Sequence, residues 1–200
     1  MAGITENYFI PLSYSLFLSK EHLLLSARNT ERPSNVFNLE RNSSHLQNRS
    51  RWLRRTLRSH PTWCKGHFEL ARSEIIKLHL SKEKKDGRSI ATIRSSAKAL
   101  LALDGEEPEV KLKSKMLFAF SDFFSNDFEG AKDKFFSVAA SPQASMLIDT
   151  DRALVCEYGA ASAMSLCDEG EAKAILETIP EHLRTQDVLT MLQYLKTKQG

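Results

Sequence analysis

The sequence contains only three cysteines, and they are too far apart to form a recognisable metal or disulfide pattern. Cys64, Cys156 and Cys167 are odd in number, and no Cys-x-x-Cys or His-x-x-x-His pair is present. The absence of such pairs argues against the common structural zinc motifs. Isolated thiols are typical of a reducing compartment, so we expect a cytoplasmic protein without a bound metal.

A hydrophobic run long enough to cross a membrane is also lacking. The apolar residues near the N-terminus, within 9–18, are interrupted by serines, and Glu6 precedes them. This segment is too short to span a bilayer, and it lacks the basic flank and the cleavage site of a signal peptide. We therefore expect neither a membrane span nor export.

Residues 1–48 are expected to form an N-terminal apolar helix followed by a polar linker. Leu16, Leu23 and Leu24 supply the apolar stripe of a helix predicted over residues 12–27. Residues 28–48 are rich in Asn, Ser and Arg, a composition typical of a linker. The folded domain is therefore predicted to occupy residues 49–200.

Catalytic patterns are missing from the chain. No glycine-rich phosphate loop is present, and the six histidines are scattered. None of them has a Ser, Cys or carboxylate at a spacing that specifies a catalytic site. We therefore expect a protein that is not an enzyme and that needs no cofactor.

Glycine and proline are scarce, and no alternating run of β-branched residues is long enough to predict a strand. What the chain has instead is helical periodicity, most clearly in residues 126–142. Asp127 is a favourable first residue for a helix, and the next apolar positions fall on one helical face. A preceding run repeats in the same way, with a tight Ser-Asn-Asp turn between the two. We predict an all-α fold in which amphipathic helices follow one another in antiparallel pairs.

Small residues recur at matching places in these pairs. The separation between Ala119 and Ala131 is the same as that between Ala160 and Ala172. Small side chains at a helix crossing let two backbones approach closely. Further upstream, residues 61–71 have the pattern of a first helix, and Pro108 and Pro142 stand in comparable places.

This pattern resembles the tetratricopeptide repeat (TPR), a helix–turn–helix unit of about 34 residues with small residues at the crossing. The resemblance implies a short right-handed α-solenoid of antiparallel helix pairs. A C-terminal helix over residues 187–198 is expected to cap the last pair with its leucines, namely Leu189, Leu192 and Leu195. The implied function is that of a protein–protein interaction scaffold or adaptor.

In tetratricopeptide domains, the first helix of each repeat lines a concave groove. Counting from the small crossing residues assigns this groove to Lys65, Phe68, Arg72, Lys113, Met116 and Glu157. Such a mixed basic and apolar surface suits an acidic peptide or helix with a hydrophobic anchor. Phe120 and Phe123 are also near the groove, but we favour a place for them in the core. The Lys and Asn pattern that tetratricopeptide domains use for chaperone tails is missing.

The densest basic element lies in residues 49–60. On a helix, Leu53 and Leu57 would pack inward, and a basic patch would spread over the outer surface, consisting of Arg51, Arg54, Arg55 and Arg58. Several guanidiniums on one face can neutralise a nucleic-acid backbone. The favoured alternative is a solvated helix whose arginines pair with nearby acids.

Three functions therefore remain open from the sequence. The first is a non-catalytic scaffold that binds an acidic protein or peptide partner. The second is a nucleic-acid-associated protein that uses the basic helix, which is less favoured. The third is a helical accessory subunit of a larger enzyme or secretion assembly.

Overall fold

The computed structural model describes residues 39–80 and 86–198, and every element within these ranges is helical. This confirms the all-α prediction for the described part of the chain. The elements are α2 (Leu39–Ser59), α3 (Cys64–Leu80), α4 (Gly87–Asp104), α5 (Pro108–Phe124), α6 (Phe128–Ala139), η2 (Pro142–Met146), α7 (Asp149–Ser165), α8 (Glu169–Glu177), η3 (Glu181–Leu183) and α9 (Gln186–Lys198).

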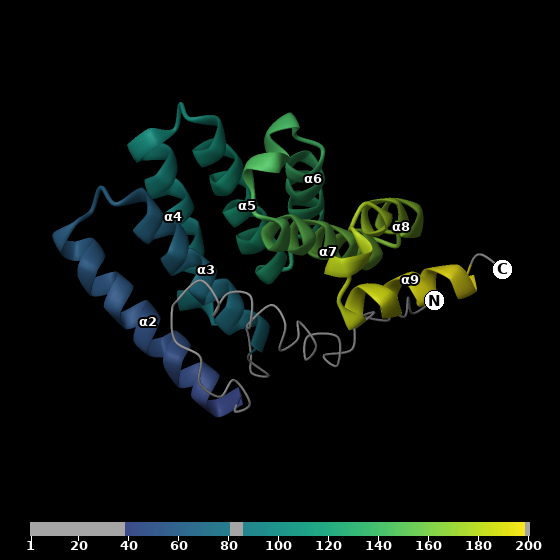
Figure 1. Cartoon of the computed structure of the whole chain (residues 1–200), viewed down its shortest axis with the longest axis horizontal. Helices are drawn as coiled ribbons and strands as arrows, with labels where there is room; N and C mark the ends of the chain where they lie inside the picture. The colour runs from purple at the N-terminus through teal and green to yellow at the C-terminus, as the bar shows by residue number, and fades with distance from the viewer. Residues whose placement is uncertain (1–38, 81–85, 199–200) are drawn as a thin grey trace, which may run out of the picture.

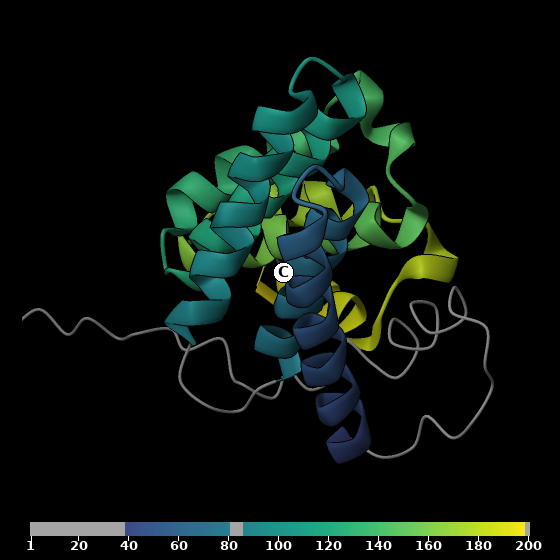
Figure 2. The same ribbon diagram turned by 90° about the vertical axis from the view of Figure 1, so that its left-hand side faces the viewer.

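Packing follows the order of the chain. Each helix from α2 to α9 contacts the next one, and α5 also contacts both α3 and α7. The first helices of the predicted pairs, α3, α5 and α7, therefore form a row of neighbours. Helix α2 lies at one end of this arrangement and α8 and α9 lie at the other (Figure 1, Figure 2).

Two of the turns between helices share one construction. Asn126, after α5, and Cys167, after α7, both adopt a left-handed backbone, with φ of 66° and 60°. The next residue in each turn, Asp127 or Asp168, donates its backbone N–H to a carbonyl in the preceding helix. Its carboxylate then accepts a hydrogen bond from the third residue of the following helix. Each aspartate thus ends one helix and begins the next, as the Schellman and N-cap motifs require.

The main core lies between α3, α4, α5, α6 and α7, and aromatic rings fill its centre. Phe120 contacts Phe135 edge-to-face with ring centroids 4.9 Å apart, and it contacts Tyr158 at 5.0 Å. Phe120 is 2% exposed, which confirms its predicted place in the core. Phe123 is partly buried against the same cluster, with its ring 4.8 Å from that of Tyr158.

Helix α9 packs its buried side chains with those of α7 and α8 in a second core cluster. Leu192 and Leu195 are buried there as predicted, together with Val188 and Met191. The prediction for Leu189 is wrong, because this residue is 46% exposed. The buried positions follow the spacing of Val188, Met191 and Leu195, which turns Leu189 toward solvent.

Helix α2 begins at Leu39, so the predicted boundary at residue 49 is too late. Part of the segment expected to be a linker is helical because an apolar stripe extends into it. Leu46 and Ser50 are buried on the same face as Leu53 and Leu57. The helix predicted over residues 12–27 lies outside the described residues.

Candidate functional site

The side chains that the resemblance assigns to a groove are partly gathered on the row formed by α3, α5 and α7. We call this surface the α3–α5–α7 face and define it by Lys65, Phe68, Glu69, Arg72, Lys113 and Asp151. Positions 65, 68, 69 and 72 fall on one side of α3 because residues three and four apart are neighbours on a helix. The Nζ of Lys113, from α5, lies 4.9 Å from the centre of the Phe68 ring. This distance is within the range of a cation–π interaction.

The charges on this face are paired within the molecule. Arg72 Nη2 lies 3.1 Å from Asp151 Oδ1 and so connects α3 to α7. Lys113 pairs with Glu109 one turn earlier in α5. Glu69 pairs with Arg49 of α2. Apart from Lys65, the charged groups of this face are therefore paired with opposite charges, whereas the sequence predicted a mixed basic and apolar surface.

Asp151 is the most buried charged group of the face, at 4% exposure. Burial raises the pKa of its carboxyl, and the positive charges of Arg72 and Lys113 oppose this rise. The negative charge of Glu69 adds to it. The pKa of this one carboxyl of α7 therefore depends on charged side chains from both α3 and α5.

Lys65 is exposed at the start of α3, whereas two of the predicted groove residues are inaccessible. Met116 is 3% exposed and belongs to the main core, because its side of α5 faces the neighbouring helices. Glu157 is 6% exposed and lies where α7 meets the start of α9. We therefore correct the assignment of Met116 and Glu157 to a binding surface. Phe68 is 7% exposed because it packs in the main core, and Lys113 Nζ lies over its ring.

Glu157 occupies an unusual environment. The Thr185 hydroxyl donates a long hydrogen bond of 3.4 Å to its carboxyl group. Burial, together with the negative charge of Asp187, raises the pKa of Glu157 to about 8. Burial also raises the pKa of Asp187, to about 6, and its Oδ2 atom is buried with no hydrogen-bond partner among the described residues. Glu157 and Asp187 are thus two buried carboxyl groups near the start of α9, and neither forms an ion pair within the described residues.

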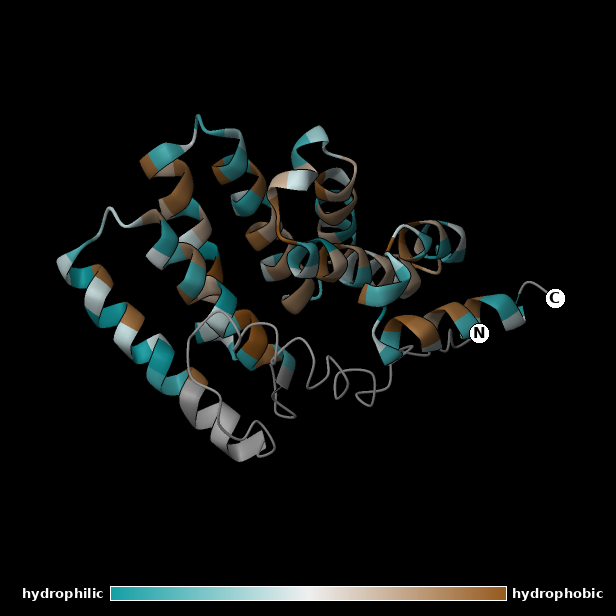
Figure 3. Ribbon diagram, viewed as in Figure 1, coloured by the Kyte–Doolittle hydropathy of each residue, from teal (hydrophilic) through white to brown (hydrophobic). Residues whose placement is uncertain are grey.

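On the basic helix, the structure separates the arginines into two groups. Arg51, Arg55 and Arg58 are exposed on the outer side of α2. Arg54 instead points toward α3, where its Nη2 lies 2.6 Å from Glu74 Oε1. The prediction that Arg54 belongs to the outer patch is therefore wrong. Leu53 and Leu57 pack inward as predicted, and Figure 3 shows α2 as a mainly hydrophilic helix with a few hydrophobic positions.

Glu74 is the centre of a polar network between α2, α3 and α4. It is 1% exposed and accepts a 2.7 Å hydrogen bond from the Ser89 hydroxyl. Lys77 lies 3.7 Å from Glu74 and 2.9 Å from Asp86, which precedes α4. The spacing of Glu74 and Lys77 within α3 does not reveal this network, because the contacts with Arg54 and Ser89 come from separate helices.

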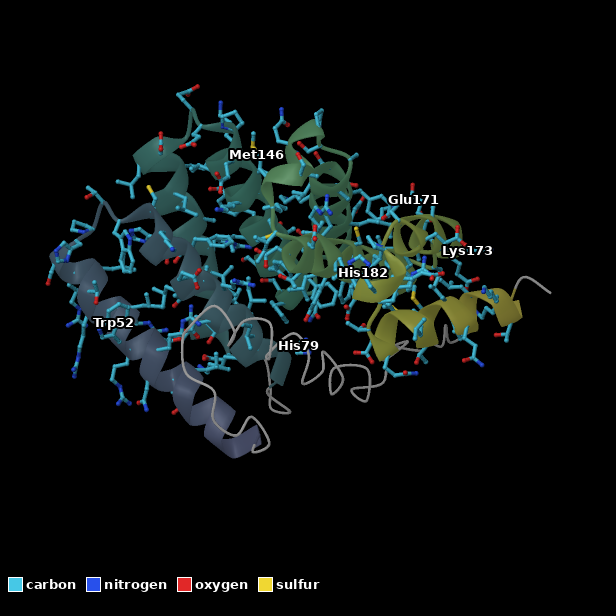
Figure 4. All side chains as sticks on the ribbon, in the orientation of Figure 1. Trp52, His79, Met146, Glu171, Lys173 and His182 are labelled. Atoms are coloured by element: carbon cyan, nitrogen blue, oxygen red, sulfur yellow. The ribbon has the colours of Figure 1, made fainter. Side chains whose placement is uncertain are left out.

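A pocket of about 180 Å³ lies on another side of the molecule, between η2, α7 and the segment after α8. Its lining includes Leu147, Val155 and Ile179, with Arg152 and Asp149 at its polar side. Arg152 pairs with Asp149 at 2.6 Å. Met146, labelled in Figure 4, is a nearby exposed apolar residue. No sequence pattern pointed to this pocket, since it depends on the 3-10 turn η2, which lengthens the connection between α6 and α7.

No group of His, Cys, Asp and Glu side chains in residues 39–80 and 86–198 is arranged to hold a metal ion. All three cysteines lie in the described residues and are unpaired. No described helix is both long and apolar enough to pass through a bilayer. Comparison with protein-family models, with curated proteins and with solved structures finds no match for this chain.

Proposed function

We propose that the chain is a non-catalytic, tetratricopeptide-like module of right-handed helix pairs that binds another protein through the α3–α5–α7 face. The observation that carries this proposal is the alignment of Phe68, Arg72 and Lys113 across neighbouring helices. The sequence resemblance assigned all of them to one binding surface, and the described contacts bring them together.

Paired charges on this face suit recognition of a partner with its own charges. Arg72, Lys113 and Glu69 have side chains that are 18%, 27% and 20% exposed, so part of each remains accessible. A partner carboxylate can replace Glu109 beside Lys113. Movement of the Lys113 ammonium toward that carboxylate would uncover the Phe68 ring beneath it for an apolar anchor. Such exchange of ion pairs contributes more to specificity and to the association rate than to affinity.

The partner that fits is an acidic peptide or helix with one hydrophobic anchor. The exposed Lys65 extends the basic side of the face beyond the paired groups. Packing of each helix on the next supplies an extended surface, which favours a scaffold or adaptor over an enzyme. The free cysteines suit a reducing compartment, and we place the protein in the cytoplasm.

The test is affinity capture with the full chain, followed by identification of the bound proteins and direct titration of the purified partner. Lys65→Glu with Lys113→Glu reverses two charges on the face. Arg88→Glu with Lys98→Glu reverses two exposed charges on α4 and leaves the same net charge. We expect the first variant to lose the partner and the control to retain it. Equal binding by the two variants would contradict this function for the α3–α5–α7 face.

A further inference from the structure

The outer side of α2 carries a second surface, independent of the α3–α5–α7 face. We call it the α2 outer stripe and define it by Arg51, Trp52, Arg55 and Arg58. The side chain of Trp52 is 57% exposed, the highest value among the large hydrophobic residues of the described chain. Figure 4 shows Trp52 on α2 at the edge of the molecule.

The arginines of the stripe are available to an external anion. Arg49 and Arg54 pair with acidic residues of α3, so α2 already satisfies the carboxylates beside it. Arg51, Arg55 and Arg58 form no ion pair with any residue of the described chain. Positions 51, 55 and 58 lie on one side of the helix, spaced over about 10 Å at 1.5 Å per residue.

Trp52 is held in place without being covered. Its ring contacts Trp63 edge-to-face, with centroids 6.2 Å apart and planes at 88°. This contact involves only part of the indole, because Trp52 remains 57% exposed. Trp52 lies at the margin of the arginine side of α2, and Arg55, three residues later, is its neighbour on the helix. An exposed indole beside guanidiniums combines a flat stacking platform with positive charge.

We propose that the α2 outer stripe binds single-stranded nucleic acid, with a base stacked on Trp52 and phosphates contacted by Arg51, Arg55 and Arg58. Unpaired bases expose the flat faces that stacking on an aromatic side chain requires, and those faces are hidden in a duplex. No base-edge reading is needed, so the stripe is expected to bind without sequence selectivity.

Other anionic partners fit less well. A helix that binds in a membrane interface buries an apolar face in lipid. The apolar face of α2 is already buried within the protein, because Leu53 and Leu57 pack against Leu70 of α3. An acidic peptide would satisfy the arginines, but only one that also carries a suitably placed apolar side chain could use the exposed indole, whereas every unpaired nucleotide supplies a base for stacking.

The test is fluorescence anisotropy of the full chain with labelled oligo(dT) over a range of salt concentrations. Nonspecific electrostatic binding at physiological salt has a dissociation constant on the order of 10⁻⁴–10⁻⁶ M. With three arginines contacting phosphates, the logarithm of the association constant is expected to fall with the logarithm of salt concentration with a slope of about −2. Arg51→Gln with Arg55→Gln and Arg58→Gln should abolish most of this dependence.

Trp52→Ala separates stacking from charge. Loss of one stacked base weakens binding by roughly 5- to 140-fold, which corresponds to about 1–3 kcal/mol. Trp52→Phe retains a ring and should restore most of the affinity. Arg88→Gln with Lys98→Gln and Lys196→Gln removes equal charge from exposed sites on α4 and α9, and this control should bind oligo(dT) as the wild type does.

Circular dichroism establishes that each variant is folded, as expected for changes to exposed side chains. Duplex DNA, polyglutamate and vesicles of phosphatidylcholine with phosphatidylserine serve as competitors. Equal competition by duplex DNA together with unchanged affinity of Trp52→Ala would reduce the stripe to a general basic surface and overturn the proposal. Preferential binding of polyglutamate or vesicles would also overturn it. Either result leaves the protein-binding role of the α3–α5–α7 face untouched, because Lys65 and Lys113 are unchanged in these variants.

Discussion

Arg72 of α3 and Asp151 of α7 form an ion pair, with Nη2 and Oδ1 3.1 Å apart, that connects two helices not adjacent in the chain. Asp151 is almost fully buried, so its charge depends on this partner. Both residues belong to the α3–α5–α7 face, so the same ion pair connects two helices of the fold and forms part of the proposed binding surface.

Loss of Arg72 should destabilise the protein strongly. Arg72→Met leaves the Asp151 carboxylate buried without its partner, and breaking a buried pair in this way costs about 3–5 kcal/mol. Because Asp151 can take up a proton, we expect the lower end of this range. The double variant Arg72→Met with Asp151→Leu should recover most of the loss in urea unfolding. If the single and double variants unfold at the same urea concentration, the loss of stability does not come from leaving the Asp151 carboxylate without its partner.

Arg54 and Arg55 are adjacent in sequence but should differ in their effect on stability. Arg54→Gln removes the 2.6 Å contact with the buried Glu74, whereas Arg55 is exposed and lacks an ion-pair partner in the described residues. We expect a loss of about 1–3 kcal/mol for Arg54→Gln, since Lys77 and Ser89 still interact with Glu74. Arg55→Gln should stay within about 0.5 kcal/mol of wild type. Thermal unfolding of the two variants, side by side, checks this difference.

Cys167→Gly should stabilise the protein. The left-handed backbone of Cys167, with φ of 60°, costs a residue with a Cβ atom about 1 kcal/mol or more, and glycine avoids this cost. Asn126→Gly is the matched control at the equivalent turn, where asparagine already tolerates this conformation. Denaturant unfolding should show a gain of up to about 1 kcal/mol for Cys167→Gly and a smaller one for Asn126→Gly. A loss of stability in Cys167→Gly would refute the assigned turn conformation.

Stability should fall as the pH rises toward 8. The pKa of Glu157 is raised from 4.5 to about 8 by burial and by Asp187, so the folded state binds this proton more tightly than the unfolded state does. A raised pKa stabilises the fold fully below about pH 4.5, and this contribution is lost as the pH rises through about 8. The slope from Glu157 alone reaches at most about 1.4 kcal/mol per pH unit.

Glu157→Gln removes this titration and should flatten the dependence between pH 6 and pH 8, measured as the free energy of unfolding in urea. Glu177→Gln, at an exposed position on α8, is the control and should keep the wild-type slope. Identical slopes in all three proteins would show that Glu157 is not the group responsible.

Local signals explain which parts of the fold could be predicted from the sequence. Asp127 begins α6 and Pro108 begins α5, because a capping carboxylate and a fixed proline φ favour helix starts. The spacing of Leu53 and Leu57 gave the buried side of α2. Each of these features depends on residues within one or two helical turns.

The remaining features depend on contacts between distant segments. Arg54 points inward because Glu74 lies across the helix pair, and no pattern within α2 reveals this acid. The resemblance assigned Glu157 to a groove, but Thr185, directly before α9, contacts its carboxyl group. Residues 39–48 have a linker composition, and they are nevertheless helical because Leu46 and Ser50 continue a buried stripe.

Site-specific photocrosslinking tests the central claim most directly, namely that the α3–α5–α7 face binds a protein partner. A photoreactive amino acid replaces Lys65 on this face or, in a second protein, Lys98 on the exposed side of α4. We expect a discrete crosslink from position 65 to the partner isolated by affinity capture, no such crosslink from position 98, and loss of the first when Lys113→Glu is added. A crosslink from position 98 alone, or an equal yield from both positions, would contradict the account.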